Sequence, residues 1–217
     1  MNKNLKPFLI ILIVSLILFF LIQIVYKTIQ TGNNIIKSSN DLIENILNIS
    51  SYEAELEVTI NSNKTTNKYL LHQYYIKPNL SKQIVKEPSN IEGLEIIYNG
   101  NKLEIKNTNL GLSKIYENYT YLNDNLLWLN FFVESCNVNK YTIEETENEI
   151  ILNTKIQVYN GKLYINKKTN LPAKIEILDN SNQAKIYIEY KEIKLNNIQE
   201  ENIFAFSTKD IRKEVKF

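Results

Sequence analysis

A regular alternation of apolar and polar residues begins at Tyr52 and limits the possible folds more than any other feature of the chain. Apolar side chains occupy every second position here, and acidic residues or threonine stand between them: Tyr52, Ala54, Leu56, Val58 and Ile60. A period of two places these side chains on one face of an extended chain. The pattern therefore predicts a β-strand with one buried face and one solvated face.

Further strands are predicted by the same pattern along most of the chain. The candidates are residues 68–77, 80–86, 94–98, 102–106, 140–145, 149–159, 162–166, 173–178 and 184–195. Asn99-Gly100 and Asn160-Gly161 separate apolar runs in the manner of type I′ hairpin turns, and residues 179–182 form a polar turn. Strands joined by tight turns predict an antiparallel meander, which needs no crossover helices.

Two segments have a helical period instead. Residues 33–49 carry apolar side chains at steps of three, four and seven, and Asn40 or Asp41 could cap a shorter helix there. Residues 110–138 are rich in Leu and aromatic residues, and Asp124 or Asn125 could cap a helix within them. We expect an α+β fold, mostly β, in which a strongly curved antiparallel sheet, a half-barrel, is covered by helices.

An uncharged stretch, residues 7–26, precedes these elements. As a helix of 20 residues it would span about 30 Å, the thickness of the bilayer core. A cleaved signal peptide is the alternative, but no small-x-small cleavage site follows the stretch. We therefore expect one N-terminal transmembrane helix. Lys3 and Lys6 precede it, which predicts a cytoplasmic N-terminus.

This anchor divides the chain into four parts. We expect a cytoplasmic tail over residues 1–6, the anchor over 7–26, a juxtamembrane linker and helix start over 27–39, and an extracytoplasmic domain over 40–217. The protein would then be a single-pass protein of the cell membrane, with its domain at the forespore or cell surface. Outside the three lysines that flank the anchor, the chain has a net charge of −2.

Composition excludes several kinds of site. The whole chain has a net charge of +1, which argues against nucleic-acid binding. Five Gly form no phosphate-binding loop, and one Cys and one His provide neither a disulfide nor a zinc site of the usual kinds. We expect no cofactor, no metal and no catalytic residues, so the protein is not expected to be an enzyme.

Three features could be mistaken for sites. His72 has no nucleophile or orienting carboxylate in any motif, so we interpret it as structural or partly exposed. Cys136 has only acidic Glu134 nearby, and we expect it to be a small buried side chain. The acidic row Glu53, Glu55 and Glu57 is interpreted as a solvated strand face that discourages edge pairing.

One stretch could form a binding site, because its aromatic residues could close an apolar groove under the curved sheet. Ordinary packing of a helix on the sheet is the alternative, and the sequence does not decide between them. The candidate groove or lid residues are Tyr98, Tyr116, Leu127, Trp128, Phe131 and Phe132.

Several short motifs, in order along the chain, resemble the LolA-like family of lipoprotein-sorting proteins. They include Tyr75-Ile76-Lys77-Pro78, the Asn99-Gly100 hairpin, Thr169 to Pro172, a long strand from Ile186 to Leu195, and the end Phe204-Ala205-Phe206. The resemblance covers residues 40–217 and implies a curved antiparallel sheet covered by helices.

Within that family the chain looks most like the clostridial GerS-like germination lipoproteins. This resemblance rests on Glu87-Pro88, on residues 93–100 and on 117–129, and a composition rich in Asn, Ile and Lys agrees with an AT-rich clostridial genome. It implies a non-enzymatic protein that supports a spore-cortex amidase of the CwlD type. The lipidated N-terminal Cys of those lipoproteins is absent from this sequence.

Two hypotheses follow for the domain. The first is a binding partner of a cell-wall amidase or another envelope protein, with contacts through an exposed sheet edge, which could also form a homodimer. The second is a carrier or sensor of a lipid or lipoprotein acyl chain held in the apolar groove.

Overall fold

The computed structural model describes residues 38–62, 64–119, 126–198 and 201–205. Residues 1–41 and 42–217 form two compact units, of which the second contains the whole sheet. The predicted tail and anchor, and the capping residues Asp124 and Asn125, lie outside the described residues. Within the described ranges, no helix has the length and apolar character needed to cross a membrane.

The second unit is built on one antiparallel sheet of eleven strands, in the order β6-β5-β4-β3-β2-β1-β11-β10-β9-β8-β7. The strands are β1 (Ser51–Asn61), β2 (Thr66–Ile76), β3 (Leu80–Glu87), β4 (Leu94–Asn99), β5 (Leu103–Asn107), β6 (Leu112–Tyr116), β7 (Tyr141–Glu145), β8 (Glu149–Ile156), β9 (Tyr159–Asn166), β10 (Leu171–Leu178) and β11 (Ala184–Leu195). The expected mostly-β fold is confirmed.

The strand order consists of two meanders that meet at the centre of the sheet. One runs from β1 to β6 and the other from β7 to β11, and β1 pairs with both β2 and β11. The prediction that the acidic row of β1 discourages edge pairing is therefore wrong, because β1 is a central strand. Two of its glutamates, Glu53 and Glu57, form ion pairs instead, for example Glu57 with Lys191 at 3.3 Å.

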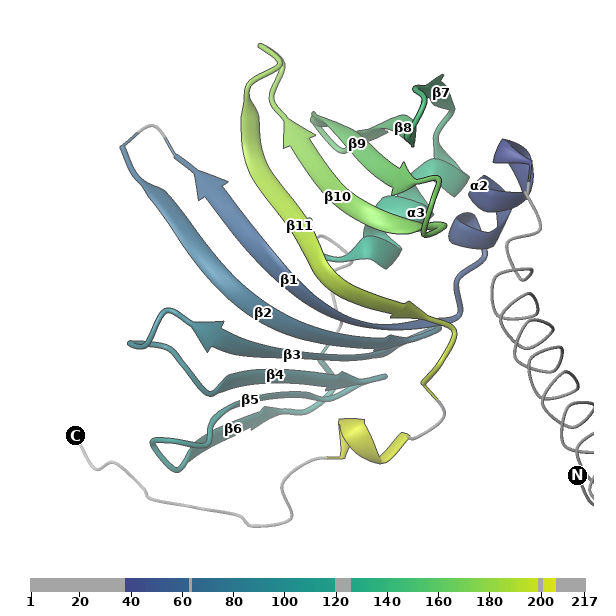
Figure 1. Ribbon diagram of the computed structural model, residues 1–217. Coiled ribbons are helices and arrows are strands. Elements are labelled where there is room, and N and C mark those ends of the chain that lie inside the picture. Colours follow the sequence, from purple (N-terminus) through teal and green to yellow (C-terminus); the bar gives the residue numbers. More distant parts are fainter. Residues whose placement is uncertain (1–37, 63, 120–125, 199–200, 206–217) are drawn as a thin grey trace, which may run out of the picture. The chain divides into compact units, whose positions relative to one another are not determined.

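The two faces of the sheet differ in chemistry. The inner face carries Tyr52, Ala54, Leu56 and Val58 of β1, all fully buried, and the outer face carries the glutamates between them. Figure 1 shows the long strands β1, β2 and β11 bending around the inner face. Residues directly opposite each other on neighbouring strands share a face. The register therefore shows which side chains of the remaining strands lie on the inner face and which on the outer face.

Two helices pack on this sheet. Helix α2 (Ser39–Leu47) contributes Leu42, Ile43 and Ile46 to the core, and helix α3 (Leu129–Val138) contributes Leu129, Phe132, Val133 and Cys136. Helix α2 begins with a capping box, in which the Asp41 amide donates to Ser38 Oγ (3.2 Å) and the Ser38 amide donates to Asp41 Oδ2 (3.1 Å). The predicted helical period thus gives a shorter helix that begins at Ser39.

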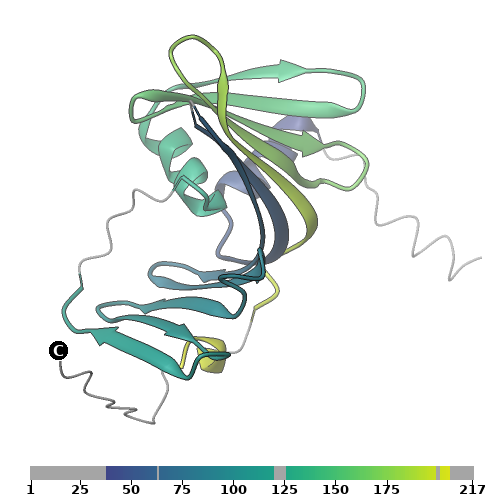
Figure 2. The same cartoon turned by 90° about the vertical axis from the view of Figure 1, so that its left-hand side faces the viewer.

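The sheet has two arms that are covered differently. In Figure 2, α3 lies inside the curve of the sheet next to the arm formed by β8 to β11, which we call the covered arm. The arm formed by β3 to β6, which we call the open arm, is contacted by η1 (Glu201–Phe204), and Phe204 of η1 is buried. The helical cover therefore belongs mainly to one arm.

The hairpin predictions were partly wrong. Asn160 and Gly161 lie inside β9, and the turn from β8 to β9 is at Gln157 and Val158, where Gln157 has a φ of 53°. At the other pair, Gly100 has a φ of 96° but Asn99 remains in β4, so this hairpin has a three-residue loop and no type I′ turn. The polar turn at residues 179–182 is confirmed.

Gly161 has a packing role that explains its place in a strand. A Cβ atom on Gly161 would lie 2.4 Å from Ile156 Cδ1 and 3.0 Å from Phe132 Cε2. The absence of a side chain at this position of β9 therefore leaves room for Ile156 of β8 and for Phe132 of α3.

Candidate functional site

The predicted groove residues fall into two groups in the structure. Trp128 and Phe132 are buried around α3, and Leu127 and Phe131 are half-buried against the same core. Tyr98 and Tyr116 lie instead on β4 and β6 of the open arm. Four of the six residues therefore lie in or against the main hydrophobic core.

The two tyrosines of the open arm face different surroundings. Tyr98 is buried, and its hydroxyl donates a hydrogen bond of 2.6 Å to the carbonyl of Gly100. Tyr116 is 36% exposed, with its ring 6.3 Å from that of Tyr119 and the ammonium of Lys114 4.9 Å from its centroid. Tyr116 thus belongs to a surface cluster at the edge of the sheet.

A buried polar network connects the centre of the sheet to the start of α3. Gln73, fully buried on β2, accepts from the Tyr52 hydroxyl (3.2 Å) and donates from Nε2 to Gln83 Oε1 (2.9 Å) and to the Leu127 carbonyl (3.3 Å). The ring of Tyr52 also lies 6.4 Å from that of Trp128. Sequence reasoning missed this network, although a Gln at an inward position of an alternating strand is a recognisable signal.

The single histidine and cysteine have structural surroundings. His72 Nε2 lies 3.1 Å from Glu53 Oε1 on the outer face, and its ring stacks on Tyr74 at 4.5 Å. The prediction that Cys136 is a small buried side chain is confirmed, and burial raises the pKa of its thiol to about 12. Such a thiol stays protonated at neutral pH and is a poor nucleophile.

The described residues contain no group of three or more His, Cys, Asp or Glu side chains placed to hold a metal ion. The ionised groups of the outer face form ion pairs across neighbouring strands, such as Lys82 with Glu95 at 3.1 Å, and also along one strand, such as Lys174 with Glu176 at 3.2 Å. These pairs present no exposed nucleophile next to a base.

Both edges of the sheet expose apolar side chains. On β6, Leu112, Ile115 and Tyr116 are exposed, and on β7, Tyr141 and Ile143 are exposed. Within the described ranges, neither strand has a partner on its outer side. A short edge strand with apolar side chains can pair with a strand of another chain.

Solved structures with similar backbones cover most of this chain. An uncharacterized conserved protein from Thermus thermophilus is 13% identical, with a TM-score of 0.52, and the match covers 80% of this chain and 96% of that chain. This likeness supports the fold. No curated protein sequence matches the chain significantly.

Two further structures were found by the same comparison. One is that of the CwlD amidase from Clostridioides difficile in complex with the GerS lipoprotein, with 25% identity, a TM-score of 0.45, and coverage of 70% of this chain and 91% of that chain. The other is the LolA superfamily protein NE2245 from Nitrosomonas europaea, with 14% identity, a TM-score of 0.42, and coverage of 78% and 98%.

Comparison with family sequence models gives a match to the sporulation proteins described as YdcC-like. The match spans residues 6–204, so it includes the uncharged stretch at the N-terminus as well as all eleven strands. Because this is well over half of its length, the chain belongs to the YdcC-like family of sporulation proteins.

Proposed function

We propose that this protein is a non-enzymatic binding protein of the sporulating cell envelope, anchored by residues 7–26, which supports a cell-wall amidase. Membership in a sporulation family supports the cellular process. The amidase as partner comes from the sequence resemblance to GerS-like proteins, and the membrane location from the uncharged N-terminal stretch.

One observation carries the choice of docking surface, namely the exposed apolar edge of the open arm. Leu112 and Ile115 project to opposite faces of β6 and are 59% and 42% exposed. An added strand would bury part of both side chains and would satisfy the outer backbone groups of β6 at the same time. The partner would therefore supply an extended segment with apolar side chains.

The edge at β7 provides a matched control. Ile143 of β7 is 43% exposed and, like Ile115, lies in a five-residue edge strand. The β7 edge also carries Glu144 and Glu145, whose charges oppose the approach of an apolar segment. Replacing either isoleucine by lysine changes the charge equally, so only the place of the change differs.

The test is affinity capture with the full chain, solubilised in detergent, from sporulating cells of its host. We expect the wild-type chain to retain a cell-wall amidase, measured as amidase activity and identified by mass spectrometry. Ile115→Lys should lower the retained activity at least about tenfold, which corresponds to about 1.4 kcal/mol, and Ile143→Lys should leave it unchanged.

Other results would contradict parts of this proposal. Capture of no amidase would refute the amidase as partner, and loss of capture only in Ile143→Lys would transfer the docking surface to β7. If light scattering shows dimers of the purified chain that Ile115→Lys separates, the β6 edge serves self-association, as the sequence-based hypothesis of a homodimer allows.

A carrier of lipid or lipoprotein acyl chains is the second candidate function. The observation that favours it is a half-buried apolar surface on the inner face of the open arm, formed by Leu94, Ile96 and Ile105. Tight retention of a fatty acid by the purified full chain, abolished by Ile96→Asp, would support this function over the first.

A further inference from the structure

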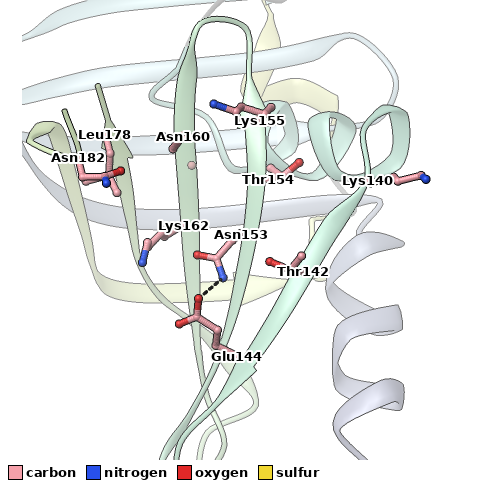
Figure 3. Close-up of a pocket in the computed structure, with 11 residues that line it drawn as sticks. Lys140, Thr142, Glu144, Asn153, Thr154, Lys155, Asn160, Lys162, Leu178 and Asn182 are labelled. Carbon is pink, nitrogen blue, oxygen red and sulfur yellow. Dashed lines mark hydrogen bonds between the residues drawn. The ribbon is translucent and has the colours of Figure 1, made fainter. Parts of the chain in front are cut away.

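A polar hollow lies on the outer face of the covered arm, on the side of the sheet opposite to α3. Its volume is 390 Å³, within the range of small-molecule sites. It is formed by β7, β8 and β9 and by the turn that follows β10 (Figure 3). Its lining is Lys140, Thr142, Glu144, Asn153, Thr154, Lys155, Asn160, Gly161, Lys162, Leu178 and Asn182.

Two lysines give this hollow its charge. Lys155 projects from β8 and Lys162 from β9, and in Figure 3 both ammonium groups point toward the side where Asn182 lies, whereas that of Lys140 points away. Within the part of the chain that the structure describes, neither Lys155 nor Lys162 has a carboxylate within ion-pair distance. Both are thus available to an anion from solution.

The register explains why these lysines have no ion pair. Lys162 lies opposite Glu176, but the carboxylate of Glu176 already binds Lys174 Nζ (3.2 Å) and the Tyr164 hydroxyl (2.9 Å). Lys155 lies opposite Asn160, which is neutral. Other outer-face lysines, such as Lys82, do have a carboxylate partner. The lining of the hollow holds three lysines and one glutamate, which gives it a formal net charge of +2.

Amide groups complete the lining. The side chains of Asn160 and Asn182 have no hydrogen-bond partner among the described residues. Asn153 Nδ2 donates to Glu144 Oε1 at 3.1 Å, which holds this carboxylate in place as an acceptor for hydroxyl groups (Figure 3). The hollow therefore combines the two cations with one carboxylate, that of Glu144, and with the neutral amides of Asn153, Asn160 and Asn182.

We infer that this hollow binds an anionic, hydroxyl-bearing unit of a saccharide or polyol polymer. The carboxylate or phosphate would lie between Lys155 and Lys162, and hydroxyl or acetamido groups would bond Asn160, Asn182 and Glu144. The site is separate from the β6 edge, and only the expectation that the polymer belongs to the cell wall rests on the proposed function.

The test is calorimetric titration of the detergent-solubilised full chain with three probes. N-acetylmuramic acid carries a carboxylate, glycerol 3-phosphate carries a phosphate, and N-acetylglucosamine is the neutral control. We expect saturable binding of at least one anion and much weaker binding of the neutral sugar. The double variant K155Q/K162Q should weaken the bound anion about tenfold, the combined effect of two exposed charge contacts.

A second double variant, K64Q/K168Q, removes the same charge from two exposed lysines outside the hollow and should bind like the wild type. Binding of only the carboxylate, only the phosphate, or both would support the site and identify the anionic group that it accepts. Equal binding of the neutral sugar, equal weakening by K64Q/K168Q, or no binding by a chain with unchanged thermal unfolding would overturn it. None of these results depends on capture of an amidase.

Discussion

Two rows of side chains cross the inner face, and their burial differs along the sheet. The row through the covered arm is fully buried on five consecutive strands, at Leu152, Leu163, Ile175, Ile188 and Val58. The row through the open arm becomes more exposed toward the edge, from 0% at Tyr52 through Tyr75, Ser81, Tyr98 and Leu103 to 36% at Tyr116.

Alternation along a strand predicts which face of the strand is apolar. Whether this apolar face is buried depends on its cover by helices. Both rows have the same period and the same pairing. The row beneath α2 and α3 is buried as far as β8 and becomes exposed only at Ile143 of the edge strand β7, whereas the other row is exposed at Tyr116 of β6. The buried core that stabilises the fold therefore lies mainly under the covered arm, and the proposed partner surface lies at the edge of the open arm.

The strongest test of this comparison removes the helix contact of the covered arm. Phe132→Ala should lower the free energy of unfolding by about 3–5 kcal/mol, because it leaves a cavity between α3 and β9. Urea denaturation of the detergent-solubilised chain measures this change. A cost below about 1 kcal/mol would mean that α3 does not hold the covered arm together.

A smaller loss of stability is expected from adding a methyl group at Gly161. Gly161→Ala should cost up to about 3 kcal/mol, because its Cβ would overlap with Ile156 Cδ1. Ile156→Val removes that atom, so the double variant should be less destabilised than the sum of the single variants, as measured by thermal unfolding. Additive costs would show that the overlap with Ile156 is not the cause of the destabilisation.

The junction of the two arms can be weakened at Gln73. Gln73→Ala should cost about 2 kcal/mol, because it leaves polar groups of Tyr52 and Gln83 buried without this partner. Hydrogen exchange should show faster opening of the Phe132 amide, which donates to the Trp128 carbonyl, than in a Gln83→Ala variant, which keeps the bond to the Leu127 carbonyl. Equal exchange in both variants would exclude Gln73 as the connection to α3.

The smallest effect on stability is expected at the exposed end of the open arm. Leu112→Lys should change the free energy of unfolding by no more than about 0.5 kcal/mol, because Leu112 is 59% exposed. The same change should weaken amidase capture. A large loss of stability without a loss of capture would show that the open arm is part of the core after all.

Strand positions could be predicted from the sequence because alternation depends only on the nearest neighbours in the chain. The strand β6 was missed, since Leu112 and Ile115 occur in a Leu-rich and aromatic stretch that indicates helix. The turn at Asn160-Gly161 was also misplaced. Its glycine is explained by tertiary packing against Ile156 of β8 and Phe132 of α3, which no local turn rule includes.

The candidate site was less predictable than the strands, because it too depends on contacts between residues from different strands and helices. Trp128 and Phe132 lie in the buried core, and whether an aromatic residue fills or closes a space depends on the strand opposite it. The lysines of the hollow gave no signal in the sequence. Lys162 is unpaired only because Lys174 and Tyr164 occupy the carboxylate opposite it, which is a property of the register.

The pairing of β1 with β11 has a consequence for biogenesis. The first strand of the sheet receives its central neighbour only when residues 184–195 have been synthesised, so β1 stays open on one side for most of synthesis. Contacts of such long sequence separation slow folding. A nascent chain that crosses a membrane would expose this strand to aggregation or to chaperones until its last strand arrives, and a truncation before residue 184 would leave the centre of the sheet permanently unpaired.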